Sequence, residues 1–301
     1  MNVIERLFQQ SEYQFARIRR HPGQRVPQEL IWLLLFFWIA LLVVFCLEIG
    51  LSWLIAVLFP GAGQTEQFLV LLYRTGIMSA AALLFCRLIE RRPLRTMGLT
   101  RRHMLRDYLA GVLAGGIMFG TVLLLAWKGG GLICAGMPGI AHGGTYFLLI
   151  AGWVMQGLSE ELAFRGWLMM SAGTHRNPRT AVTVSALSFA AAHLANSGIS
   201  VPAFINLLLF SVLMSMIVLR TDSIWAAAAV HSTWNWIQGS FFGLPVSGLT
   251  GGDTVFAFLP TGRSEWLTGG AFGPESGLAA SLVLLAGLIL LLLLPLHRET
   301  E

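Results

Sequence analysis

Three short segments of the sequence carry polar side chains whose types and spacing suit acid–base chemistry. The first, "GLSEELAFRGW" at 157–167, places Glu160, Glu161 and Arg165 in an otherwise apolar stretch. Glu161 and Arg165 are four residues apart, so on a helix they share a face and can form an ion pair. Glu160 points about 100° away from Glu161 on the same helix. Unless it finds an ordinary hydrogen-bond partner, it is a lone carboxylate suited to exchanging protons, as general acid–base catalysis requires.

The other two segments supply imidazole and amide groups. "SALSFAAAHLANSG" contains His193, and "SIWAAAAVHSTWNWIQG" contains His231 and Asn235, four residues apart on one helix face. A single buried histidine is more often a satisfied core residue than a catalyst. Three polar sites in three apolar segments can instead work together: a carboxylate and an imidazole can activate a water, while His231 and Asn235 donate hydrogen bonds to a developing oxyanion.

Zinc is the alternative way to activate the water. Glu160, His193 and His231 are residue types that ligate Zn²⁺, which would then lower the pKa of the bound water. The sequence does not decide between a metal-free carboxylate and a zinc mechanism. Both routes lead to hydrolysis of a peptide bond inside a membrane.

The elements that must position these residues are membrane helices. Of 301 residues, 55% are hydrophobic and 12% charged, and a bilayer-spanning helix needs roughly 20 mostly apolar residues. We therefore predict an all-α polytopic membrane protein, a bundle of about eight transmembrane helices with an intramembrane active-site cavity. The first 29 residues lack the features of a cleavable signal, so the first helix is expected to be a retained anchor. The predicted spans are 31–59, 67–89, 107–127, 145–170, 180–197, 201–219, 223–240 and 276–296.

The distribution of basic residues predicts the orientation. Sixteen of the 20 Lys and Arg residues fall on the side of the N-terminus, and two fall on the other side, as the positive-inside rule predicts for a cytoplasmic N-terminus and an even number of spans. Both termini are then cytoplasmic. The basic loop 87–106 orients the chain and attracts anionic lipid headgroups; it is not taken as a nucleic-acid site.

This topology divides the chain into five parts. They are a basic cytoplasmic N-terminal segment, 1–30; three N-terminal helices with their basic cytoplasmic loop, 31–127; a catalytic core of helices four to seven, 145–240; an extracytoplasmic loop, 241–275; and a C-terminal helix with a short cytoplasmic tail, 276–301. The Gly-rich segment 128–144 is expected to be a simple connection, whereas the loop 241–275 could either dip into the membrane or cover an opening. The three cysteines match no metal or redox spacing.

Depth supports a shared site. Counting about 1.5 Å per residue from the predicted span ends puts Glu160, His193, His231 and Asn235 at about 13 to 20 Å from the cytoplasmic side. These residues are therefore expected to meet around one small cavity that opens toward the cytoplasmic side. Glu48 and Arg74 lie on consecutive antiparallel spans and are expected to form a structural ion pair.

The three segments together resemble a known family. "EELAFR" (Glu160 to Arg165) matches EExxxR, "FAAAH" (Phe189 to His193) matches FxxxH, and "HSTWN" (His231 to Asn235) matches HxxxN. In order and placement they resemble the CPBP family of CAAX-processing and bacteriocin-processing intramembrane endopeptidases, also called Abi or Rce1-type proteases. The resemblance covers roughly 145–240.

The resemblance implies roles for these residues. Glu160 would activate the water, His193 would assist it, and His231 with Asn235 would stabilise the oxyanion. Glu161, Arg165 and Phe189 would support the site. The substrate would be a membrane-embedded or lipidated protein or peptide, and the location the bacterial cytoplasmic membrane. No cofactor is required unless a zinc mechanism applies. The substrate's identity and the oligomeric state do not follow from the sequence.

Two other interpretations remain open. A catalytically silent member of the same fold would bind or shield a peptide as an immunity or scaffold protein. A proton-coupled transporter would use Glu160 and Glu48, but the hydropathy profile shows no clear inverted repeat.

Overall fold

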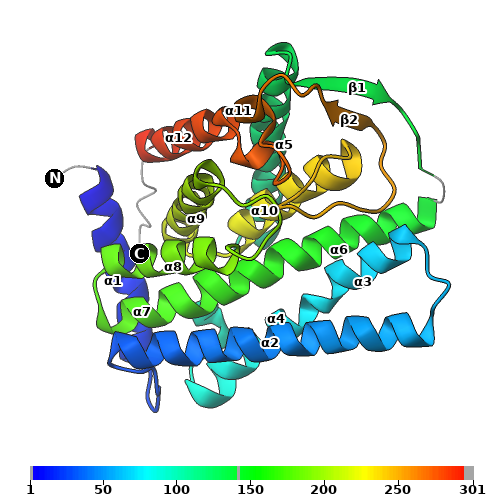
Figure 1. The fold of residues 1–301 in the computed structure, drawn as a ribbon. Coiled ribbons are helices and arrows are strands. Elements are labelled where there is room, and N and C mark those ends of the chain that lie inside the picture. Colours follow the sequence, from blue (N-terminus) through cyan, green and yellow to red (C-terminus); the bar gives the residue numbers. More distant parts are fainter. Residues whose placement is uncertain (1–2, 141–142, 295–301) are drawn as a thin grey trace.

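The structure, a computed structural model, describes residues 3–140 and 143–294 and consists of helices with one small sheet (Figure 1). The helical elements are α1 (Val3–Arg19), α2 (Leu30–Leu58), α3 (Gln64–Arg74), α4 (Gly76–Leu84), η1 (Phe85–Ile89), η2 (Leu94–Met97), α5 (Met104–Lys128), α6 (Gly143–Glu161), η3 (Leu162–Met169), α7 (Met170–His175), α8 (Pro178–Ala192), α9 (Val201–Thr221), α10 (Trp225–Trp236), η4 (Ile237–Phe241), α11 (Glu265–Thr268), η5 (Pro274–Ser276) and α12 (Leu278–Leu293). The strands are β1 (Leu132–Gly136) and β2 (Ala257–Pro260).

Each of the eight predicted spans coincides with a helix in the described part of the chain. Five helices there are long and apolar enough to cross a membrane: Leu30–Leu58, Gln64–Ile89, Met104–Lys128, Gly143–His175 and Val201–Thr221. The helices at the other three predicted spans, α8, α10 and α12, fall below the length that defines these five. The prediction of a helical, polytopic membrane protein is thus confirmed, whereas the number of crossings stays a prediction. The predicted tail lies partly in 295–301, outside the described residues.

The N-terminal segment is more ordered than the sequence analysis proposed. It forms α1, an amphipathic helix whose Leu7, Phe15 and Ile18 are buried. The Gln14 side chain donates a hydrogen bond of 2.8 Å to the carbonyl of Leu219 at the end of α9. The signal was present in the sequence, because these apolar residues recur at helical spacing.

The expectation of an all-α chain is wrong in one detail. β1 and β2 pair antiparallel, with Leu132 opposite Pro260 and an irregularity between Cys134 and Gly136. The segment 128–144 is therefore not a simple connection: it is tied to the predicted extracytoplasmic loop 241–275. Backbone hydrogen bonds also attach this loop to η4, for instance from Phe256 N to Phe241 O.

The centre of the bundle is α10, which is buried on all sides from Ala226 to Asn235. Small residues let its neighbours approach closely. A Cβ placed on Gly111 of α5 would lie 2.4 Å from the carbonyl oxygen of Ala226, and one on Gly157 of α6 would lie 2.4 Å from Ser232 Oγ. Glycines therefore hold α10 against both α5 and α6.

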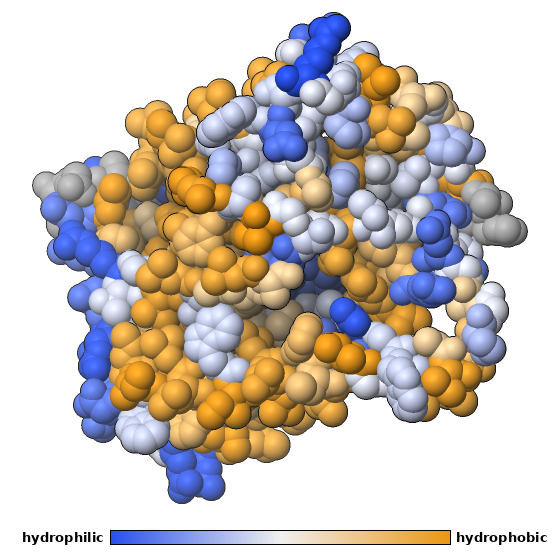
Figure 2. All heavy atoms as spheres, in the orientation of Figure 1, coloured by the Kyte–Doolittle hydropathy of each residue, from blue (hydrophilic) through white to orange (hydrophobic). Residues whose placement is uncertain are grey.

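Glu48 and Arg74, the charged residues expected at membrane depth in α2 and α3, are paired. Arg74 Nε lies 3.8 Å from Glu48 Oε2, and Arg74 Nη1 donates to Ser52 Oγ at 2.9 Å. The predicted ion pair is confirmed. Figure 2 shows that apolar residues cover most of one face of the molecule, with hydrophilic residues along its left edge and a hollow near its centre.

Candidate active site

One long helix carries both glutamates. α6 ends at Glu161, and the chain continues through the π-helical segment η3 into α7. A π-helix replaces the usual i→i−4 hydrogen bonds and is often found at functional sites. Other elements bind the carbonyls of η3: Ser185 Oγ donates to Phe164 O at 2.9 Å, and Arg92 Nη2 donates to Gly166 O at 3.1 Å. The register of the helix just past the glutamates is thus fixed from outside.

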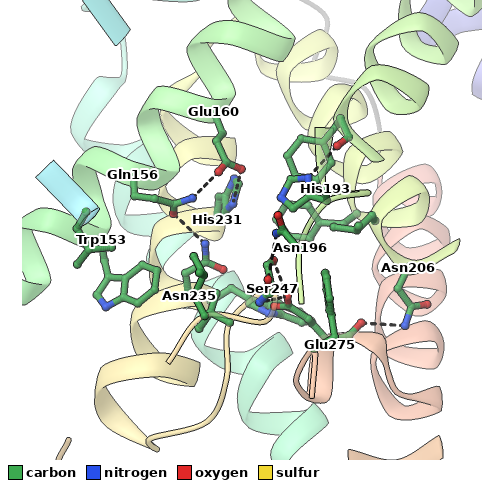
Figure 3. Close-up of a pocket in the computed structure, with 18 of the residues that line it drawn as sticks. Trp153, Gln156, Glu160, His193, Asn196, Asn206, His231, Asn235, Ser247 and Glu275 are labelled. Carbon is green, nitrogen blue, oxygen red and sulfur yellow. Dashed lines mark hydrogen bonds and ion pairs between the residues drawn. The ribbon is translucent and has the colours of Figure 1, made fainter. Parts of the chain in front are cut away.

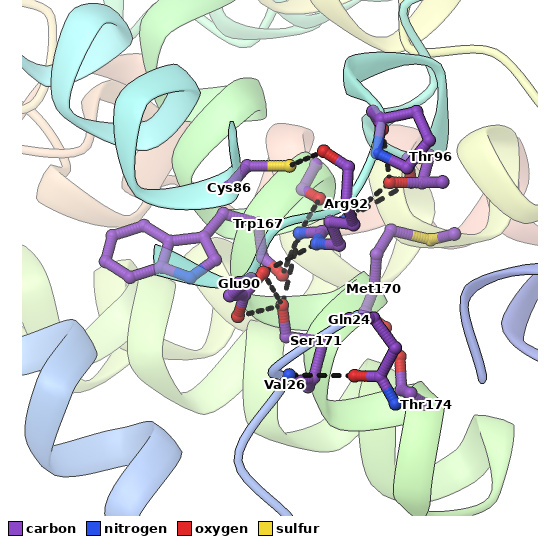
Figure 4. Close-up of polar contacts among 12 residues, drawn as sticks. Gln24, Val26, Cys86, Glu90, Arg92, Thr96, Trp167, Met170, Ser171 and Thr174 are labelled. Atoms are coloured by element: carbon purple, nitrogen blue, oxygen red, sulfur yellow. Dashed lines mark hydrogen bonds and ion pairs between the residues drawn. The ribbon is translucent and has the colours of Figure 1, made fainter. Parts of the chain in front are cut away.

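Arg92 belongs to a fully buried polar cluster next to η3 (Figure 4). Its Nε lies 2.5 Å from Glu90 Oε2, its Nη1 donates to Thr96 Oγ1, and its Nη2 reaches Ser171 Oγ. A buried ion pair is stable only when its geometry is good and its other donors are satisfied. Here every guanidinium nitrogen has an acceptor, so the basic loop is firmly attached to the helix that carries the glutamates.

The predicted Glu161–Arg165 pair is confirmed. Arg165 Nη1 donates to Glu161 Oε1 at 2.9 Å, and both side chains are completely buried. The Arg165 guanidinium also lies 4.6 Å from the centre of the Phe189 ring, a cation–π contact. Arg165 therefore contacts both of the other residues expected to support the site.

His231 joins the two glutamates. Its Nδ1 lies 2.8 Å from Glu161 Oε1, while its Nε2 lies 3.5 Å from Glu160 Oε2 (Figure 3). Because the Glu161 carboxylate accepts a hydrogen bond, Nδ1 carries a proton and Nε2 faces Glu160. The contact between His231 and Glu161 was not predicted, since it depends on how closely α10 packs against α6.

Gln156 is a site residue that the sequence analysis missed. Its Nε2 donates to Glu160 Oε1 at 2.6 Å, and its Oε1 accepts from Asn235 Nδ2 at 2.9 Å (Figure 3). Glu160 is thus connected to Asn235 through one amide. The spacing was a usable signal, because Gln156 precedes Glu160 by four residues and so shares its helix face.

The other oxygen of Glu160 is different. Glu160 Oε2 is buried and accepts no hydrogen bond from any residue that the structure describes. The whole side chain is 16% exposed and lines the cavity. A carboxylate oxygen without a donor has lone pairs that can accept a hydrogen bond from a molecule in the cavity.

His193 lies across the cavity from Glu160 (Figure 3). The predicted span 180–197 is helical only to Ala192, so His193 caps α8 instead of lying within it. Its Nδ1 is bonded to Phe189 O at 2.8 Å, and its ring lies 4.7 Å from the Phe189 ring. Since the carbonyl accepts, the Nδ1 proton is fixed and Nε2 is left as an acceptor.

One cavity of about 90 Å³ brings the predicted residues together: Glu160, His193, His231 and Asn235 all line it. This volume admits a few water molecules. Part of its wall comes from the predicted extracytoplasmic loop, through Val246, Ser247 and Leu249. Of the two roles left open for this loop, the structure thus agrees with covering an opening.

Glu275 is a further acid on that wall. Its Oε1 accepts from Ser247 N at 2.6 Å and from Ser247 Oγ at 2.7 Å, so it anchors the turn that closes the cavity. Burial raises the pKa of the Glu275 carboxyl to about 7, although these two hydrogen bonds and one from Gln238 act in the opposite direction.

Within 3–140 and 143–294, no group of three His, Cys, Asp or Glu side chains is close enough to hold a metal ion. Of the three candidate ligands, His231 and His193 each bond through Nδ1, to Glu161 and to Phe189 O, and so leave Nε2 free of these bonds. Histidines that ligate metals commonly make such a bond with the other ring nitrogen. The geometry instead offers a carboxylate, two imidazoles and an amide around a polar pocket, which is a set suited to general acid–base chemistry.

Glu160, Glu161, His231 and Arg165 form one buried group in which each carboxylate lies beside a basic side chain. Buried charges are tolerated when they are paired in this way.

Comparison with known families agrees with the motifs. Residues 142–237 match the model of a family described as Rce1-like, type II CAAX prenyl endopeptidase Rce1-like. The match contains all three motif segments, so the predicted resemblance is confirmed for this part of the chain. A search among curated proteins finds no match to this chain.

Proposed function

We propose that this chain, whose residues 142–237 form a Rce1-like domain, is an intramembrane endopeptidase that hydrolyses a peptide bond of a membrane-associated or lipidated protein. The observation that carries the proposal is the position of Glu160. One of its oxygens is held by Gln156, and the other makes no hydrogen bond within the described residues and lies 3.5 Å from His231 Nε2 at the cavity. This arrangement suits a base that takes a proton from water.

In the proposed reaction, Glu160 removes a proton from a water molecule, with His193 Nε2 as a second acceptor that orients the water. The oxygen attacks the carbonyl carbon of the scissile bond, and the negative charge moves to the carbonyl oxygen. His231 Nε2–H and the second Nδ2–H of Asn235 donate hydrogen bonds to this oxyanion. Donors fixed in advance in a site with little water stabilise such a charge strongly.

The intermediate then collapses. Glu160 passes its proton to the leaving nitrogen, the carbon–nitrogen bond breaks, and a carboxylate and an amine are released. Glu161, Arg165 and Phe189 act indirectly, because together they hold His231 in position. No step uses a metal, so the proposed activity should survive removal of divalent cations with a chelator.

The proposed topology has eight crossings in a bacterial cytoplasmic membrane, with both termini cytoplasmic. The support is the basic-residue distribution and the agreement of eight helices with eight predicted spans. In this arrangement the three shorter helices, α8, α10 and α12, are shielded within the bundle or reach only part of the way across.

The test compares membranes from cells that produce the wild-type chain or Glu160→Ala, and maps new protein termini by mass spectrometry. We expect a set of termini that depends on the wild-type residue and that persists when a chelator is added. Glu160→Gln, which keeps the shape of the side chain, should also abolish these termini. The alternative, a catalytically silent binding protein of the same fold, predicts identical termini in all samples, and that result would overturn the proposal.

A further inference from the structure

His193 lies in a turn just past the end of a helix. α8 ends at Ala192, and the chain continues through residues 193–196 as a turn. Residues beyond a helix end lack the backbone hydrogen bonds of the helix, so other contacts must hold them. In the proposed reaction His193 Nε2 orients the water at Glu160, and the position of this turn therefore matters for the chemistry.

Asn196 makes the side-chain contact that holds this turn. Its backbone N–H donates to the carbonyl oxygen of His193 at 3.0 Å. Its side-chain Nδ2 donates to the carbonyl oxygen of Ser247, also at 3.0 Å. One residue thus joins the turn that carries His193 to the loop segment that forms part of the cavity wall (Figure 3).

The two backbone segments also pack directly against each other. A Cβ placed on Gly248 would lie 2.1 Å from the carbonyl oxygen of Ser197, the residue after Asn196. No side chain can fit between the segments at this point. A displacement of the loop segment 246–249 would therefore displace the turn that carries His193.

Ser247 has a backbone conformation that needs support. Its φ is +49°, in the left-handed region that residues other than glycine seldom adopt. Val246 and Leu249 exchange two backbone hydrogen bonds of 2.8 Å, so Ser247 and Gly248 form a two-residue hairpin turn. A conformation of this kind persists only where the surrounding structure over-determines it.

Glu275 provides this support. Its Oε1 accepts hydrogen bonds from Ser247 N at 2.6 Å and from Ser247 Oγ at 2.7 Å. The backbone of Glu275 is held in turn by Asn206 of α9, whose Nδ2 donates to the Glu275 carbonyl oxygen at 2.9 Å. A continuous series of hydrogen-bonded residues therefore connects α9 to the turn of His193 (Figure 3).

We infer that Asn196 and Glu275 are positioning residues of the catalytic site: they clamp Ser247 between them, and through it they keep His193 opposite Glu160. This inference rests on the proposed endopeptidase function and adds to it two residues that lie outside the three motifs. Because small displacements of a reacting group are costly, the loss of either contact to Ser247 should slow cleavage.

The first test removes the contact between Asn196 and the loop. Asn196→Ala deletes the donor to Ser247 and leaves the backbone bond to His193 in place. We expect Glu160-dependent termini to form at least tenfold more slowly. The matched control is Asn177→Ala at the other end of α8, which deletes a helix-capping bond to Thr180 N and should stay within twofold of wild type. Equal losses in both variants would overturn the inference.

The second test asks whether the two residues act through the same contact. Glu275→Ala should also slow cleavage at least tenfold. Because both residues act through Ser247, the double variant should be no more than threefold slower than the slower single variant. Residues that act independently have additive free energies, so their rate losses would multiply to at least a hundredfold. That result would overturn the inference.

A third measurement does not depend on activity. In chains with ¹⁵N-labelled histidine in detergent, the ring signals of His193 are those lost in His193→Gln. Asn196→Ala and Glu275→Ala should each shift these signals, and Asn177→Ala should not; unchanged His193 signals in the first two would overturn the inference. If no termini depend on Glu160, the proposed function fails, and these signals still decide whether the clamp holds His193.

Discussion

Glu160 and Glu161 are adjacent in the chain but have opposite environments. Glu161 is completely buried, and one of its oxygens is bonded to both Arg165 and His231. Glu160 is partly exposed to the cavity and shares one oxygen with the amide of Gln156. Because successive helix residues point about 100° apart, one of the glutamates faces the packed interior and the other faces the pocket. This difference supports the proposed roles, which are structural for Glu161 and chemical for Glu160.

The amide of Gln156 is predicted to position Glu160 and Asn235. Gln156→Met keeps the length of the side chain but removes both hydrogen bonds, so Glu160 and Asn235 lose their common partner. Since small misplacement of reacting groups is costly, we expect the turnover rate on a Glu160-dependent substrate to fall about 10- to 100-fold. The thermal midpoint in detergent should change little, because Gln156 is only partly buried. An unchanged turnover rate would contradict a positioning role for this amide.

Contacts within one helix could be predicted from the sequence, and contacts between helices could not. The Glu161–Arg165 pair follows from four-residue spacing. The contact between His231 and Glu161 needs the rotation and depth of α10 against α6, which no spacing encodes. The depths counted along the predicted spans placed the four candidate site residues near one plane, but they did not identify the hydrogen-bond partner of each residue.

At the scale of the elements, a glycine of α6 sets how closely α10 packs against the helix that carries the glutamates. Gly157 lies one residue after Gln156 and three before Glu160, and it faces Ser232. His231 is the neighbour of Ser232 in the chain. The position of the imidazole relative to Glu160 and Glu161 is therefore set by the closest approach of α6 and α10.

Gly157→Ala tests this packing. A Cβ there would lie 2.4 Å from Ser232 Oγ and 2.7 Å from Ser232 N, so the helices must separate. Overpacking of this kind costs about 1–3 kcal/mol, and we expect a lower thermal midpoint together with a severe loss of turnover. The control is Gly120→Ala in α5, where a Cβ meets nothing within 4 Å; it should be neutral or slightly stabilising. Equal effects of the two variants would contradict the argument.

The sequence predicted helices correctly in long apolar runs. It failed where contacts with another element determine the backbone conformation. The predicted spans coincide with helices because apolar runs of that length have few alternatives. The end of α8 at Ala192, the π-helical segment η3 and the β1–β2 pair depend on partners distant in sequence, such as Arg92 beneath Gly166. Local patterns carry no information on those partners.

On the scale of the whole molecule, the cavity is closed by the loop 241–275, which the sequence placed outside the membrane. The turn at 246–249 is held by Asn196, which donates to Ser247 O, and by Glu275, which accepts from Ser247. Gly248 permits the close approach, because a Cβ there would lie 2.1 Å from Ser197 O and its φ is +81°. A mildly hydrophobic loop rich in glycine gives no signal of such anchoring, which explains why the sequence could not decide whether the loop dips into the membrane or covers an opening.

Glu275 makes the stability of the folded chain depend on pH. Its pKa is raised from 4.5 to about 7 by burial, so between these values the folded state holds a proton that the unfolded state has released. Stability from this group is complete below about pH 4.5 and is lost as the pH rises through about 7. The loss is at most about 3 kcal/mol, from 1.36 kcal/mol per pKa unit.

Glu275→Gln removes the titration while keeping the side chain's size. Thermal unfolding in detergent between pH 4.5 and 8 should show the wild-type midpoint falling relative to that of the variant, by several degrees over the range. Because the neutral amide does not lose a proton, the variant should be the more stable of the two above pH 7. Parallel midpoint curves for the two chains would show that the pKa of Glu275 is not raised in the folded state.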